Sequence, residues 1–207
     1  MSGAGRPVAE IAAVLLTGIL CVLLEALSCA RLCFIVSCVL AWGVYLAVRV
    51  GQDPFVTRAW GLRLDNLGRA ALPCALLLAA AATGMLGYRL VQGWRPLPLS
   101  SLIVFLLYPL WGFFQQFFVQ ALFVGNLDRL GVPRAVVVPV AAVLFGLVHV
   151  PNWVLVGLCV PAGAAWTLLF LRAPNLLPLA LCHGWLGALT YYWVLGRDPL
   201  AELVSAG

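Results

Sequence analysis

Three glutamines interrupt a long apolar run, and polar groups inside such a run restrict how the chain can fold. The run covers residues 99–124 and carries Gln115, Gln116 and Gln120 within the stretch WGFFQQFFVQ. It is long enough to span a bilayer, where a buried amide without a partner costs roughly 1–3 kcal/mol or more. In a helix Gln116 and Gln120 share one face, whereas Gln115 points about 100° away. The amides therefore cover a broad sector, and something polar must face them.

Two explanations fit these glutamines. They can be hydrogen-bonding contacts between neighbouring helices, which is a common use of polar residues in membrane bundles. They can also line a functional cavity, which buried polar residues in a membrane more often mark. The positions of the remaining polar residues bear on this choice.

The composition is that of a polytopic membrane protein. Of 207 residues, 64% are hydrophobic and 9% are charged, and the mean hydropathy is +1.08, which is too apolar for a soluble domain. The net charge of +5 comes from twelve arginines and no lysine. Most of the arginines end apolar runs, where they would meet lipid headgroups, so the charge does not indicate nucleic-acid binding. The seven cysteines form no CxxC pair and are expected to be small buried side chains.

We expect an all-α, polytopic transmembrane helical bundle of about seven spans, folded as a single integral membrane domain over residues 1–207. No linker, repeat or low-complexity segment separates a second domain. Residues 51–69 mix aromatic, leucine and arginine side chains, which is typical of an interfacial segment between the second and third spans. The seven apolar runs are residues 8–27, 32–48, 70–91, 99–124, 135–149, 152–171 and 176–195.

The first apolar run could be taken for a signal peptide, because Arg6 precedes it and Cys29 follows it. Glu10 and Glu25 flank the apolar stretch and a second run follows at once, so we expect an uncleaved first membrane helix. Seven spans would place most arginines on the side of the N-terminus. The positive-inside tendency then predicts a cytoplasmic N-terminus, and we expect a multi-pass protein of a bacterial inner membrane.

The two histidines lie deep in apolar sequence, at the end of the fifth run and early in the seventh. His149 follows Phe145 by one helical turn, so the aromatic ring can form a wall beside the imidazole. A single buried histidine is more often structural than catalytic. His149 and His183 on separate helices, beside a helix with three glutamines, favour a shared site instead.

These positions together resemble the CAAX-protease and bacteriocin-processing (CPBP, or Abi) family of intramembrane glutamic endopeptidases. In that family the motifs Glu-Glu-x-x-x-Arg, Phe-x-x-x-His and His-x-x-x-Asn or Asp follow in this order on successive helices. The resemblance covers residues 99–195, which we take as the motif-bearing core. The corresponding positions here are Gln115, Gln116 and Gln120, then Phe145 and His149 with the following Pro151 and Asn152, then His183 and Gly187.

The departures from the family pattern affect the chemistry that the resemblance implies. In the family, the first glutamate and the second-motif histidine activate water, and third-motif residues help to stabilise the oxyanion. Gln115 and Gln116 replace the glutamate pair, Gln120 replaces the arginine, and Gly187 replaces the Asn or Asp. A carboxylate can accept a proton from water, but a carboxamide cannot, so the family's general base is absent.

The substitutions are consistent with one another. Replacing two acids and their cation by three amides removes every charge together, whereas breaking a buried ion pair would cost about 3–5 kcal/mol. Glutamine also keeps the length of glutamate and both hydrogen-bonding capacities. We therefore expect a neutral hydrogen-bonding site, the Gln/His cage, made of Gln115, Gln116, Gln120, His149 and His183.

Three functions compete. The first is a peptidase-fold protein that binds a hydrophobic peptide, a lipid-modified protein or a lipid in the Gln/His cage without glutamic proteolysis. The second is an active intramembrane endopeptidase in which His149 or His183 is the base and the amides position water or polarise the carbonyl. The third is a transporter or a structural membrane subunit, which Glu25 would favour if it lies deep in the membrane, although no inverted repeat is visible.

Four further residues are candidates for the binding site. They are Phe145 beside His149, Gly187 in the third motif, Asn152 at the mouth of the site, and Tyr108, for which packing is the simpler role. Cys182 is a weak nucleophile candidate, because side chains of adjacent helix residues such as Cys182 and His183 point about 100° apart.

We expect no cofactor and no metal, since two histidines supply too few ligands and glutamine is a weak one. The expected partners are the bilayer and a hydrophobic or lipid-modified peptide or protein.

Overall fold

The computed structural model describes residues 5–24 and 28–205 and is helical, with no strand in those ranges. This confirms the predicted all-α class. Glu25, on which the transporter hypothesis depends, lies outside the described residues. The elements are α1 (Gly5–Leu23), α2 (Ser28–Gln52), α3 (Val56–Ala59), α4 (Leu67–Val91), α5 (Ser101–Gln116), η2 (Phe117–Val124), α6 (Gly125–Arg129), α7 (Arg134–Leu147), α8 (Trp153–Arg172), α9 (Leu176–Leu189), η3 (Thr190–Leu195) and α10 (Pro199–Ser205).

Five helices in the described part of the chain are long and apolar enough to cross a membrane. They are Gly5–Leu23, Cys33–Gln52, Leu67–Val91, Ser101–Arg129 and Trp153–Arg172. The fifth apolar run forms the shorter helix Arg134–Leu147, and the seventh run changes from α9 to the π-helical η3 at Thr190. A membrane-embedded helical protein is thus supported, while the count of seven spans and the interfacial location of residues 51–69 stay predictions.

Contacts divide the chain into two compact units. The first unit consists of Met1–Arg63 and Phe117–Pro174, and the second of Leu64–Gln116 and Asn175–Gly207. The division falls between Gln116 and Phe117, so the first two glutamines of the first motif belong to the second unit and Gln120 to the first. The single domain expected from the sequence stays a prediction.

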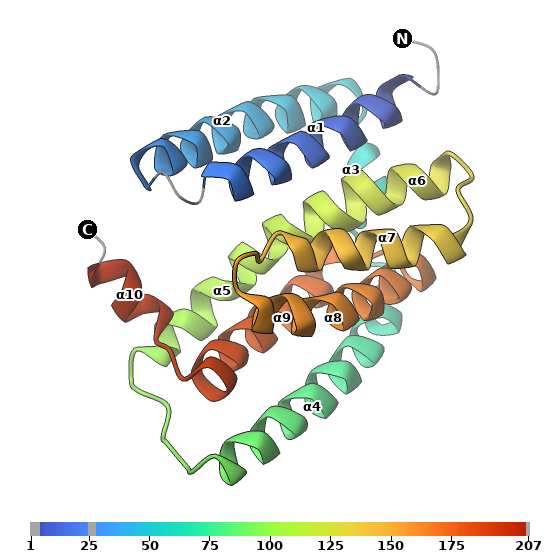
Figure 1. Ribbon diagram of the computed structural model, residues 1–207. Helices are drawn as coiled ribbons and strands as arrows, with labels where there is room; N and C mark the ends of the chain where they lie inside the picture. Colours follow the sequence, from blue (N-terminus) through green and yellow to red (C-terminus); the bar gives the residue numbers. More distant parts are fainter. Residues whose placement is uncertain (1–4, 25–27, 206–207) are drawn as a thin grey trace. The chain divides into compact units, whose positions relative to one another are not determined.

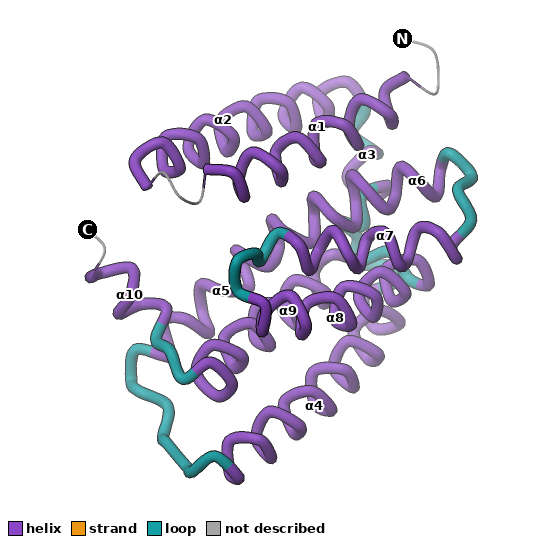
Figure 2. Tube along the Cα trace, in the orientation of Figure 1, coloured by secondary structure: helices purple, strands orange, loops and turns teal. Residues whose placement is uncertain are grey.

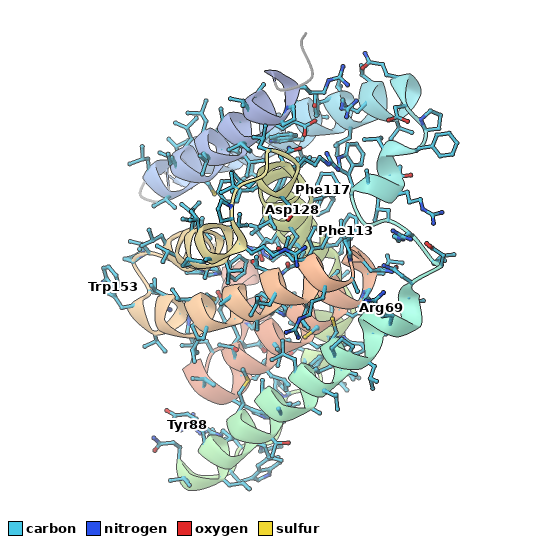
Figure 3. The ribbon with its side chains drawn as sticks, turned by 90° about the vertical axis from the view of Figure 1, so that its right-hand side faces the viewer. Arg69, Tyr88, Phe113, Phe117, Asp128 and Trp153 are labelled. Atoms are coloured by element: carbon cyan, nitrogen blue, oxygen red, sulfur yellow. The ribbon has the colours of Figure 1, made fainter. Side chains whose placement is uncertain are left out.

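In the first unit, α7 lies against α8 (Figure 1). Small residues permit the close approach. A Cβ added to Gly163 would lie 3.2 Å from Cα of Ala142 and 3.1 Å from Cβ of Phe145. A Cβ on Gly146 would meet the Val160 side chain at 2.5 Å. Small residues at helix contacts are the usual basis of packing in membrane bundles. Trp153 marks the start of α8 (Figure 3).

A buried charged cluster also joins parts of the first unit. The Glu10 carboxylate on α1 accepts hydrogen bonds from Tyr45 Oη on α2 and from Asn126 Nδ2 on α6. Arg49 Nε lies 3.4 Å from the same carboxylate. Glu10, Arg49 and Asn126 are only 4%, 7% and 0% exposed. Ionisable side chains inside a membrane protein are stable only with such partners.

In the second unit, α9 packs against both α4 and α5 (Figure 1). Arg69 and Tyr88 mark the two ends of α4 (Figure 3). A loop follows α4 and leads into α5 (Figure 2). The contact between α5 and α9 depends on glycine, because a Cβ on Gly184 would overlap the backbone of Pro109. Trp185 Nε1 donates to the Phe105 carbonyl across the same contact.

The glutamine-bearing helix changes its hydrogen-bonding pattern directly after Gln116. Residues Phe117–Val124 form the π-helix η2, in which each N–H bonds five residues back rather than four. The regular α-helical hydrogen bonding of α5 therefore does not continue through η2. Gln116 and Gln120 are both fully buried, and the shared face expected for them stays a prediction.

Candidate functional site

Gln116 and His183 contact each other inside the second unit. Gln116 is the last residue of α5, His183 lies in the middle of α9, and they are 0% and 8% exposed. Gln116 Nε2 lies 3.2 Å from His183 Nδ1. An amide N–H donates here, so His183 Nδ1 is the acceptor and the proton of the neutral ring is on Nε2. The first and third motifs therefore meet, as the sequence predicts.

The start of α9 is held by its own capping group. Asn175 Oδ1 accepts a hydrogen bond from the Leu177 backbone N–H, and Asn175 Nδ2 donates to Asn66 Oδ1 at 2.9 Å. An Asn at this position satisfies a helix N–H that would otherwise lack a partner. Asn175 is fully buried, and its cap marks the residue at which the helix that carries His183 begins.

The other side of the Gln116 amide is open to a further interaction. Its oxygen Oε1 is buried and has no hydrogen-bond partner among the described residues. A buried amide oxygen without a partner is unfavourable by about 1–3 kcal/mol. An N–H or O–H donor from a ligand would remove this cost, so the position suits a polar group of a bound molecule.

Gln120 has the same chemistry in the first unit. Its Nε2 donates to Thr167 Oγ1 on α8 at 3.3 Å, and both side chains are fully buried. Its oxygen Oε1, like that of Gln116, has no partner within the described ranges. Sequence reasoning missed Thr167, because a threonine in an apolar helix gives no motif by which to recognise it.

His149 lies in the turn between α7 and α8, in the first unit. Its Nδ1 is 2.9 Å from the Phe145 carbonyl oxygen, and its ring centroid is 5.4 Å from that of Phe145. The predicted contact of these two second-motif residues is therefore present. A carbonyl only accepts, so Nδ1 carries the proton, and Nε2 of the neutral imidazole can act as an acceptor or a base. Cys159 Sγ lies 3.7 Å from this Nε2, a neighbour that the sequence did not suggest.

Asn152 has a structural role. It is the N-cap of α8, and its Oδ1 accepts from the Leu155 backbone N–H at 3.1 Å. The predicted ability to accept from backbone groups is thus used to begin the helix that carries Cys159 and Thr167.

Tyr108 and Gly187 contact each other in the second unit. A Cβ on Gly187 would lie 3.4 Å from Cδ1 of Tyr108, and the Tyr108 ring also packs edge-on against Tyr191. The Tyr108 ring therefore occupies space next to the position where the family has its Asn or Asp. Gln115 is only partly buried, in contrast to the other two glutamines.

The structure thus brings together some of the predicted site residues in pairs. Gln116 contacts His183, Phe145 contacts His149, and Tyr108 contacts Gly187. The convergence of the whole Gln/His cage stays a prediction. In the described part of the chain, no three His, Cys, Asp or Glu side chains are close enough to hold a metal ion.

The comparison with known families agrees with the motifs. Residues 96–189 match the family model described as type II CAAX prenyl endopeptidase Rce1-like. No curated protein and no solved structure matches the chain. The matched segment contains every motif residue from Gln115 to Gly187. Residues 96–189 are therefore similar to the CAAX-protease-like domains of the CPBP family, with Gln-Gln-x-x-x-Gln in place of the first motif.

Proposed function

We propose that this CAAX-protease-like membrane protein binds a hydrophobic or lipid-modified peptide or a lipid, without glutamic-type proteolysis, at a site that includes the buried Gln116–His183 pair. The observation that carries the proposal is the Gln116 side chain, which is fully buried, donates to His183 and leaves Oε1 without a partner in the described residues.

The chemistry of the amides supports binding more than hydrolysis. A carboxamide does not take a proton from water near neutral pH, so neither Gln115 nor Gln116 can replace a glutamate base. The buried oxygen of Gln116 is instead an acceptor for an N–H group of a peptide or for a hydroxyl donor. Such contacts would fix the orientation of an apolar ligand, as a few polar groups do in most ligand sites.

An active endopeptidase is the second candidate. The observation that favours it is the hydrogen bond from His149 Nδ1 to the Phe145 carbonyl, which leaves Nε2 able to act as a base. In this alternative the amides would position water or polarise the scissile carbonyl. The two candidates differ in a simple way, because only the second releases a peptide product.

The ligand would reach the protein from the bilayer. Apolar helices of the described length indicate an integral membrane protein. The excess of arginines on one side supports a cytoplasmic N-terminus, and a bacterial inner membrane is the location we propose.

A binding measurement tests the proposal. The full-length protein, reconstituted in liposomes, is titrated with a fluorescent farnesylated peptide, and the peptide is recovered and analysed by mass spectrometry. We expect intact peptide and a Kd that rises at least about tenfold in Gln116→Leu, the equivalent of about 1.4 kcal/mol. Gln92→Leu, at the exposed end of α4, is the matched control and should bind like the wild type. Equal Kd values for Gln116→Leu and Gln92→Leu would contradict the proposal.

A further inference from the structure

Cys159 and His149 are adjacent in the first unit. Cys159 lies on α8, two helical turns after Asn152 begins the helix, and the turn before α8 brings His149 onto the same end. The Sγ atom is 3.7 Å from Nε2 of His149. This distance is within the range of a hydrogen bond to sulfur, so the Cys159 thiol and the His149 imidazole form a pair. His149 is also a member of the Gln/His cage, whereas Cys159 is not.

The second nitrogen of the ring fixes the direction of this hydrogen bond. His149 Nδ1 lies 2.9 Å from the Phe145 carbonyl oxygen and must donate to it. In the neutral ring Nε2 is then unprotonated, and the Cys159 S–H is the donor. The arrangement has a nucleophile, a base in contact with it, and a third group that orients the base, which is the pattern expected of an activated nucleophile.

Both side chains of the pair are partly accessible. Cys159 and His149 are both partly exposed, whereas the core residues around them, such as Phe145, are buried. The helix that carries Cys159, Trp153–Arg172, is one of those apolar enough to cross a membrane. A reagent for this thiol must therefore itself be apolar.

We propose that Cys159 and His149 form a thiol–imidazole pair that accepts a long-chain acyl group from an acyl thioester. Cys159 Sγ attacks the thioester carbonyl and forms a new C–S bond, while His149 Nε2 takes the thiol proton. The C–S bond to the donor breaks, and the donor leaves as a thiol with the proton from Nε2. One thioester is exchanged for another, so no oxidant, reductant or water is consumed.

A thioester matches this pair better than a peptide bond does. Thiol–thioester exchange needs a base for the attacking thiol and gives a thiol leaving group of similar basicity. Amide cleavage would also require protonation of a poor leaving group and donors for the oxyanion. The long acyl chain follows from the apolar environment of α8. The inference goes beyond the proposed binding function. It shares His149 with the Gln/His cage but does not depend on Gln116 or His183.

The test uses the full-length protein in liposomes with palmitoyl-CoA as the acyl donor. Site-resolved mass spectrometry, with and without hydroxylamine to cleave thioesters, gives the rate of acylation at each cysteine. Cys21 and Cys38 are partly buried on α1 and α2 and are internal controls within the same molecules. We expect Cys159 to be acylated at least about ten times faster than either control.

A variant at the base separates activation from simple exposure. His149→Gln keeps a donor for the Phe145 carbonyl but supplies no base, so acylation of Cys159 should fall about a hundredfold, the lower end of the effect of a general base. The rates at Cys21 and Cys38 should not change. Equal rates at all three cysteines of the wild type, which needs no variant to fold, would overturn the proposal. So would acylation of Cys159 that is unaffected by His149→Gln in a protein of normal thermal stability. The acylation proposal is measured by a thioester at Cys159, whereas the proposed function is measured by the Kd of a peptide. Failure of one proposal can therefore be distinguished from failure of the other.

Discussion

The amide nitrogen of Gln116 lies 3.2 Å from Nδ1 of His183, and this contact joins α5 to α9 at a fully buried position. It connects the first and third family motifs through two neutral side chains. The hydrogen bond keeps His183 in the tautomer with the proton on Nε2. His149 has the opposite tautomer, because its Nδ1 donates to Phe145. Nε2 of His183 can therefore donate a hydrogen bond, whereas Nε2 of His149 can act as a base.

Replacing a glutamine of the first motif with glutamate should lower the free energy of unfolding by an amount that depends on the position. Gln116 is fully buried and Gln115 is only partly buried, so Gln116→Glu should lower the free energy of unfolding by about 1–3 kcal/mol. Gln115→Glu, the matched control, should cost less because its carboxylate retains more of its solvation. Thermal unfolding in detergent measures both. An equal or larger loss for Gln115→Glu would contradict a dry environment around Gln116.

The contact between α5 and α9 should tolerate a methyl group at one glycine and not at another. A Cβ on Gly184 would overlap the Pro109 backbone, which cannot move without shifting α5, so Gly184→Ala should destabilise by about 1–3 kcal/mol or more. A Cβ on Gly187 would make ordinary contact with the Tyr108 ring at 3.4 Å. Gly187→Ala should therefore be neutral or slightly stabilising, since alanine favours the helix. Similar melting temperatures for the two variants would be incompatible with this packing.

The buried pair in the first unit should show strong coupling. Glu10→Gln leaves the Arg49 guanidinium buried without its carboxylate, and loss of one member of a buried pair costs about 3–5 kcal/mol. Replacing both, as Glu10→Gln with Arg49→Met, should recover most of this loss, because no unpaired charge remains. A double-mutant cycle in unfolding free energy measures the coupling. Additive losses would show that the charges do not interact.

The end of the second unit should respond to acid. Burial alone would raise the pKa of the Asp198 carboxyl, but hydrogen bonds from Ser100, the Ala201 backbone, Tyr192 and the Leu200 backbone outweigh it and lower the pKa below its ordinary value. A carboxyl with a lowered pKa in the folded state stabilises above its unfolded pKa of about 3.9 and loses that contribution as the pH falls through the folded pKa.

Hydrogen exchange of the α10 amides measures this effect. Protection should decrease below about pH 4 in the wild type, after correction for the intrinsic exchange rate. Asp198→Asn is the matched control, because it cannot titrate, and its corrected protection should not vary over the same range. The same pH dependence in the variant would assign the effect to another group.

Some contacts between candidate site residues could be predicted from sequence because their motifs are short and local. Phe145 and His149 are one turn apart, so their contact follows from helical geometry. The family pattern placed Gln116 and His183 in motifs on separate helices, and the structure shows that these two side chains are in contact. The apolar runs likewise predicted the long helices, since their length is set by the thickness of a bilayer.

Other features depend on information that periodicity does not contain. The helix changes from α-helical to π-helical hydrogen bonding after Gln116, and no residue in the run marks this change. Thr167 and Cys159 lie on an apolar helix and are recognised only through their contacts with Gln120 and His149. The partners of Glu10 come from two distant segments, so tertiary contacts alone identify them.

Peptide cleavage by the reconstituted protein tests the central claim most directly. Liposomes that contain the wild type, His149→Ala or His183→Ala are incubated with farnesylated and unmodified hydrophobic peptides. The cleavage products are quantified by mass spectrometry. The absence of glutamic catalysis predicts that the wild type retains the peptide intact and forms no more product than protein-free liposomes. Cleavage by the wild type that disappears in both histidine variants would contradict this account and identify an active endopeptidase.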